Sequence, residues 1–109
     1  MKQSSFFAAV LSSMLTLAGL PLSVYAHNAI CDCYDNGDGT ITCEGGFTDG
    51  STAVGVPIHV RDTSGKVLVD GTMSKQSDFS FPKPDVDFVV EFDAGEGHIV
   101  RIDGRDIEE

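Results

Sequence analysis

The stretch VDFVVEFD, residues 86–93, decides the fold because its side chains repeat with a period of two. A strand places alternate residues on opposite faces, whereas a helix would spread the same residues around its axis. Three acidic residues then fall on one face. The other face carries four apolar residues: Val86, Phe88, Val90 and Phe92. We therefore predict a β-strand with one buried face.

The same period recurs along the chain. VPIHVRD at 56–62 puts Ile58 and Val60 on one face and His59 on the other, and SDFSF at 77–81 also alternates. Clusters of Gly, Asp, Asn and Ser separate these runs and are typical of turns. We expect DIEE at 106–109 to fray. The predicted strands are 29–34, 40–47, 56–62, 66–71, 77–81, 86–93 and 98–102.

These segments predict an all-β fold. Many short strands at regular spacing, without helical periodicity, are typical of an antiparallel sandwich. We therefore predict a small seven-stranded sandwich that occupies residues 27–109 as one domain.

Residues 1–26 have the pattern of a secretory signal peptide. Lys2 precedes an apolar run, Pro21 ends that run, and VYA at 24–26 suits signal peptidase. The run is short and interrupted for a membrane span. We expect cleavage after Ala26, which would leave His27 as the first residue of a periplasmic or secreted protein. No later segment is apolar enough to predict a membrane span in that product.

The composition is acidic, with a formal net charge of −10. Such a balance argues against nucleic acid and anionic membranes as partners. It is compatible with attracting cations, although acidity is also common in exported proteins.

The stretch CDCYDNGDGTITC, residues 31–43, predicts a β-hairpin. A three-residue loop, 37–39, would pair Asn36 with Thr40. That register sets Cys33 opposite Cys43, with Cys31 one step along the same face. The loop is not an EF-hand, because no frame supplies both its early oxygen ligands and its final glutamate.

The cysteines leave two interpretations open. One is a Cys33–Cys43 disulfide, which an oxidising compartment favours. The other is a thiolate cluster of Cys31, Cys33 and Cys43 that binds a soft or borderline metal.

The histidines add candidate metal ligands. An amino-terminal His27 would offer its α-amine and its ring Nδ1 to one ion, and the α-amine has a pKa of about 7.7–8.0. These nitrogens suit nickel, cobalt, copper and zinc. His98 follows DAGEG at 93–97, whose glycines permit a tight turn beside an ion. Both histidines could equally be ordinary surface residues, and we expect His59 to be one.

GVPIHVRDTSGKVLVDGTMSKQSDFSFPKP at 55–84 and VVEFDAGEGH at 89–98, after a start at AH, resemble a known family. They look like the extracytoplasmic domain of small auxiliary components of nickel/cobalt ECF-type transporters. The resemblance implies a transthyretin-like, or carboxypeptidase regulatory-like, sandwich that handles a divalent metal. It also implies a membrane transporter component as partner and His27 and His98 as metal positions. The cysteine hairpin is not part of that pattern.

Three functions remain open. The first is a nickel or cobalt carrier with His27, His98 and the three cysteines as metal ligands. The second is a copper-binding sandwich of the same kind, and the third is a structural or interaction domain stapled by a disulfide. We predict no enzyme, because the sequence has neither a nucleophile elbow nor an H-E-x-x-H zinc motif.

Overall fold

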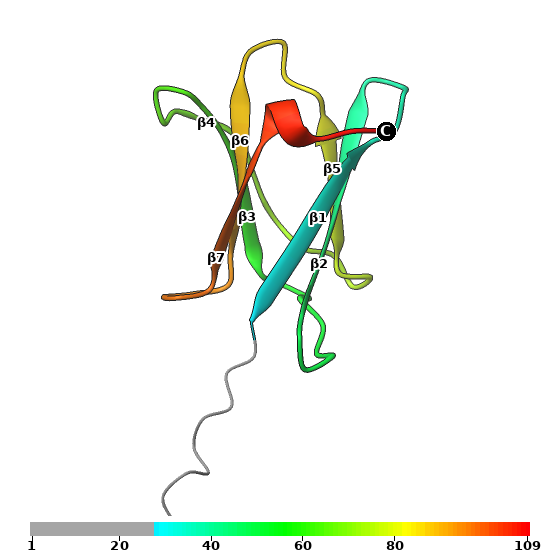
Figure 1. The fold of residues 1–109 in the computed structure, drawn as a ribbon, viewed down its shortest axis with the longest axis vertical. Helices are drawn as coiled ribbons and strands as arrows, with labels where there is room; N and C mark the ends of the chain where they lie inside the picture. Colours follow the sequence, from blue (N-terminus) through cyan, green and yellow to red (C-terminus); the bar gives the residue numbers. More distant parts are fainter. Residues whose placement is uncertain (1–27) are drawn as a thin grey trace, which may run out of the picture.

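The chain forms two antiparallel sheets that pack face to face in a computed structural model, which describes residues 28–109 (Figure 1). One sheet has the strand order β1-β2-β5, and the other has the order β4-β3-β6-β7. The strands are β1 (Ala29–Asp35), β2 (Thr40–Phe47), β3 (Pro57–Asp62), β4 (Val67–Thr72), β5 (Asp78–Pro82), β6 (Phe88–Asp93) and β7 (Ile99–Asp103).

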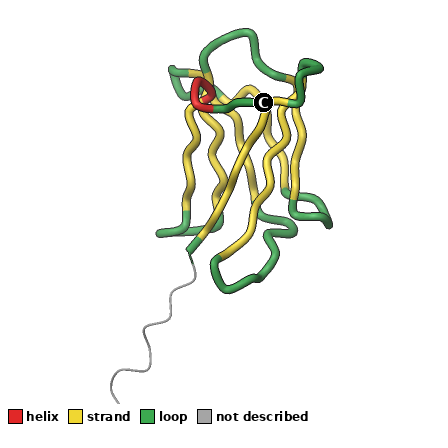
Figure 2. Tube along the Cα trace, turned by 45° about the vertical axis from the view of Figure 1, so that its right-hand side comes forward, coloured by secondary structure: helices red, strands yellow, loops and turns green. Residues whose placement is uncertain are grey.

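The predicted fold class is confirmed. Each strand begins and ends within two residues of its predicted bounds. The turns lie at the two ends of the sandwich and the strands run between them (Figure 2). A period of two suffices here because each sheet has one face against the core and one against water.

The core lies between the sheets and contains the inward residues of both. Phe92, Val90, Val60, Ile58 and Ile41 have no exposed surface. Burying each such side chain contributes about 1.5–3 kcal/mol to the free energy of folding. The two layers are therefore held together mainly by aliphatic and phenylalanine side chains.

Two details of the predicted core and tail are wrong. Val86 is 56% exposed, because β6 starts only at Phe88 and a bend precedes it. The last residues do not fray. Ile107 packs against the core, and the Asp35 amide donates a hydrogen bond to the Glu108 carbonyl at 2.8 Å.

A short 3-10 turn, η2 (Gly104–Asp106), directs this tail. Asp103 caps the turn by accepting a hydrogen bond from the Arg105 amide. The Arg105 side chain pairs with the same carboxylate, and these contacts lower the pKa of Asp103 to about 2. The chain then crosses from β7 in one sheet to the β1–β2 hairpin in the other (Figure 1).

Close packing at Gly45 gives a test of this core. A Cβ at Gly45 would lie 2.7 Å from the Phe92 ring and 3.0 Å from the Met73 methyl carbon. Gly45→Ala should therefore lower the free energy of unfolding by about 1–3 kcal/mol, measured by urea denaturation.

The adjacent glycine is the matched control. A Cβ at Gly46 would meet its nearest neighbour, the Ser51 carbonyl oxygen, at 3.6 Å, an ordinary contact. Gly46→Ala should change the stability by less than about 0.5 kcal/mol. Equal losses in the two variants would contradict the packing described here.

Candidate functional site

The β1–β2 hairpin has the predicted register. Asn36 donates its amide hydrogen bond to the Thr40 carbonyl at 3.0 Å, and Cys33 stands opposite Cys43. Counting from that hydrogen-bonded pair makes Cys33 and Cys43 a non-hydrogen-bonded pair, the closer kind in an antiparallel ladder. Their Cα atoms are 4.0 Å apart, which brings the two side chains into direct contact.

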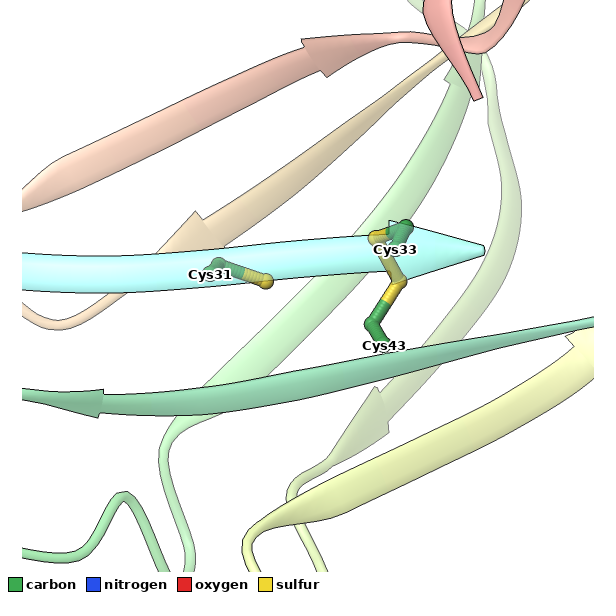
Figure 3. Close-up of side chains that lie close together, drawn as sticks. All are labelled: Cys31, Cys33 and Cys43. Carbon is green, nitrogen blue, oxygen red and sulfur yellow. A yellow bond between two sulfur atoms is a disulfide. The ribbon is translucent and has the colours of Figure 1, made fainter. Parts of the chain in front are cut away.

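The two sulfurs form a disulfide, as one of the two interpretations predicted (Figure 3). The bond joins neighbouring strands of one sheet and not the two sheets. It closes a short loop, with a sequence separation of 10. In the chain-entropy description, a loop of this length is worth about 2–3 kcal/mol of stability.

Cys31 is the free cysteine of the described residues. Its sulfur points along β1 toward the disulfide (Figure 3), and the three sulfurs lie within 4.8 Å of one another. Burial, with a smaller contribution from the charge of Asp32, raises the pKa of the Cys31 thiol to about 12. The thiol is therefore protonated at neutral pH, and a thiol is a far weaker nucleophile and metal ligand than a thiolate.

The carboxylates of the hairpin loop accept hydrogen bonds that stabilise the turn. Asp35 accepts hydrogen bonds from the Gly37 amide and the Lys83 ammonium group. Asp38 accepts from the amide and the hydroxyl of Thr40. These bonds lower the pKa of both carboxyls. The carboxylates are thus engaged within the turn, in agreement with the interpretation of this loop as a hairpin connection.

His98 lies in the β6–β7 turn. Its amide donates to the Gly95 carbonyl at 2.9 Å, and its carbonyl accepts from the Ala94 amide at 3.1 Å. Gly95 and Gly97 have φ values of 109° and 81°, a region that glycine enters without strain. The two glycines thus permit the tight turn that presents His98 at the start of β7.

His27 lies outside the described residues, and the next residue, Asn28, is hydrogen-bonded to Thr48. The Asn28 amide donates to the Thr48 hydroxyl at 2.9 Å, and the Asn28 carbonyl accepts from the Thr48 amide at 3.0 Å. These bonds hold the start of β1 against the end of β2. The sequence contained no signal for this contact, because the partners are 20 residues apart in an irregular segment.

The start of β1 and the β6–β7 turn lie at the same end of the sandwich. β1 and β7 are edge strands of opposite sheets that approach each other, and both begin at this end (Figures 1 and 2). An open depression of about 420 Å³ adjoins the turn and is lined by Asp93, Ala94, Gly95 and the segment 54–57.

The predicted ligands therefore divide into two groups. A strand rises about 3.3 Å per residue, so Cys33 lies roughly 13 Å along β1 from Ala29. Metal–ligand bonds are only about 2–2.3 Å long. One ion cannot bind both the disulfide region and the end of the sandwich that holds His98.

His59 points away from the core, as predicted. Its Nδ1 lies 2.6 Å from the Asp70 carboxylate on β4, and Glu91 is its cross-strand neighbour on β6. Glu91 in turn pairs with Arg61 and Arg101. This row of charges belongs to the outer face of the four-stranded sheet, far from the cysteines on the inner face of the other sheet.

No known protein family, curated protein or solved structure matches this chain. None of the helices in residues 28–109 has the length and apolar character needed to cross a bilayer.

Removal of the disulfide should destabilise the fold without changing it. The double variant Cys33→Ala/Cys43→Ala should lose about 2–3 kcal/mol of unfolding free energy, because its denatured chain is less restricted. Urea denaturation measures this loss. A reducing agent should lower the stability of the wild type and leave that of the double variant unchanged. Equal losses of unfolding free energy in the two proteins would mean that the disulfide does not stabilise the fold.

The Cys31 thiol should resist alkylation. With a pKa of about 12, it should react with iodoacetamide at pH 8 more than about tenfold slower than in the urea-unfolded chain. Mass spectrometry of the intact protein measures the rate. The folded pKa is raised, so the stability that this thiol contributes is present at neutral pH and falls as pH rises from about 9 to 12. Equal rates in the folded and unfolded chains would contradict its burial.

Proposed function

We propose that the protein is an exported β-sandwich that binds a divalent transition metal, nickel or cobalt, at the end where β1 begins. The ligands are the α-amine and ring Nδ1 of an amino-terminal His27, together with the imidazole of His98. The function is binding and delivery, without catalysis. The observation that carries the proposal is the shared position of the start of β1 and the β6–β7 turn (Figure 1).

Export is supported by two independent features. Residues 1–26 have the order of a signal peptide, with Lys2, an apolar run and Ala26 before the cut. The Cys33–Cys43 disulfide is typical of proteins in an oxidising compartment. Together they support a periplasmic or secreted protein whose first residue is His27.

The residue that follows His27 is anchored by its backbone. Asn28 is held by two hydrogen bonds to Thr48 at the start of β1. One residue then carries both nitrogen ligands, which lowers the entropic cost of chelation. His98 is likewise held by the backbone bonds of its turn.

The chemistry of the donors favours borderline metals. Amine and imidazole nitrogens suit nickel, cobalt, copper and zinc better than the oxygen-preferring magnesium or calcium. The net charge of −10 raises the local concentration of cations around the protein. Resemblance to auxiliary components of nickel/cobalt transporters is the reason to place nickel and cobalt first and a membrane transporter component as the recipient.

A structural or interaction domain is the second candidate. It is favoured by the oxidised state of the cysteines. In that state the disulfide stabilises the fold, and Cys31 is a buried, protonated thiol. In that case the histidines bind nothing, and metal addition leaves the melting temperature unchanged.

The decisive experiment uses the oxidised protein with His27 as its authentic first residue, verified by mass spectrometry. Calorimetric titration should show one nickel or cobalt ion per chain. Extension of the amino terminus by one residue should weaken binding more than about tenfold, because the α-amine is displaced from the chelate, and His98→Ala should also weaken it.

His59→Ala is the matched control and should leave the affinity unchanged, since His59 lies on the outer face of β3. An affinity that survives the amino-terminal extension would remove His27 from the site. Preference for Cu(II) over nickel with the same dependence on His27 would identify the copper-binding alternative.

A further inference from the structure

We propose that the cysteines form a second, redox-gated metal site: reduction of the Cys33–Cys43 disulfide turns Cys31, Cys33 and Cys43 into a three-sulfur site for Cu(I). This site is separate from the histidine end and does not depend on it. In the oxidised state the same residues are a staple. The two interpretations of the cysteine hairpin thus describe two states of one group.

The positions of the sulfurs support one ion. With metal–sulfur bonds of about 2.3 Å, three sulfurs around an ion in a plane stand about 4 Å apart. The three sulfurs already lie within 4.8 Å of one another. Opening the disulfide frees Cys33 and Cys43 to separate by side-chain rotation while the strands keep their register. The Cys31 sulfur already points toward them (Figure 3).

The burial of the cysteines and the number of ligands favour Cu(I) over other ions. Cys31 is 7% exposed, and Cys43 has no exposed surface. In residues 28–109 these cysteines are the only group of three or more His, Cys, Asp or Glu side chains close enough to share an ion. A fourth ligand for tetrahedral zinc is therefore missing from that group. Soft thiolate ligands favour Cu(I), which accepts three-coordinate sulfur.

Access to the site is through Cys33. β1 is an edge strand, and Cys33 is only half-buried, unlike Cys43. The thiolate of an external dithiol attacks Cys33 Sγ, and the electron pair of the broken S–S bond leaves with Cys43 Sγ, which takes up a proton. The second thiol of the reductant then resolves the mixed disulfide and releases Cys33 as a thiol.

Metal binding follows without further redox change. The dithiol has supplied two electrons and two protons and is itself oxidised to a disulfide. Each Cu–S bond that then replaces an S–H bond releases one proton to solvent, so the affinity for Cu(I) rises with pH. Copper stays Cu(I) throughout.

The test compares the two redox states of the full exported protein. Protein reduced anaerobically with a phosphine, which is then removed, is titrated with Cu(I) against a chromophoric Cu(I) chelator. We expect one Cu(I) bound per reduced chain with sulfur-only coordination by X-ray absorption. The oxidised chain should bind no Cu(I) through sulfur.

Cys31→Ser separates the site from the staple, because it retains the disulfide pair. It should weaken Cu(I) binding in the reduced state on the order of a hundredfold, since one of three ligands is lost. Glu44→Gln is the matched control and should leave the affinity nearly unchanged, because Glu44 follows Cys43 along β2 but lies on the exposed face of the strand. Near-ultraviolet circular dichroism verifies the fold of each variant.

The other possible outcomes either support the proposed site or overturn it. If the reduced wild type unfolds and Cu(I) restores its fold, the site is supported; if Cu(I) does not bind in either case, the proposal is overturned. If Cys31→Ser does not fold, the sulfur coordination number of the wild type decides, and two sulfurs or fewer overturn it. Nickel binding by the oxidised protein is a separate measurement, so failure of one site leaves the other unaffected.

Discussion

The register of the β1–β2 hairpin is the constraint on which the rest of the structure depends. A slip of one residue would turn every side chain of a strand to the opposite face. The Asn36–Thr40 turn, held by the carboxylates of Asp35 and Asp38, excludes such a slip. The same turn therefore puts the sulfurs inside, the apolar side chains of β2 in the core, and the polar residues of both strands in water.

The strands and the hairpin register could be predicted from the sequence because both depend on neighbours along the chain. Alternation in 86–93 and the short Gly-Asp-Gly loop determine local geometry directly. The placement of the three cysteines on one inward face follows from that geometry. The same reasoning predicted the outward direction of His59, since it needs only the parity of its position relative to Ile58 and Val60.

The contacts that the sequence did not reveal join distant segments. Two examples are the contact of Asn28 with Thr48 and the contact of Asp35 with Glu108. No periodic sequence pattern predicts them, because each involves an irregular segment. The exposed position of Val86 has a similar cause: the alternation of the sequence begins at Val86, inside a bend, whereas β6 begins only at Phe88. The sequence named the candidate metal ligands but not the distances between them. It therefore did not reveal that the disulfide lies too far from the start of β1 for one ion to bind at both places.

The course of the last residues also determines how the molecule is oriented when it is held by one end. The tail after β7 docks beside the β1–β2 turn, whereas β1 begins at the opposite end (Figure 1). An affinity tag, a solid support or a fused partner attached after Glu109 would therefore sit far from the His98 turn. A chain anchored in this way would stand upright, with its first strand and the β6–β7 turn directed into solution.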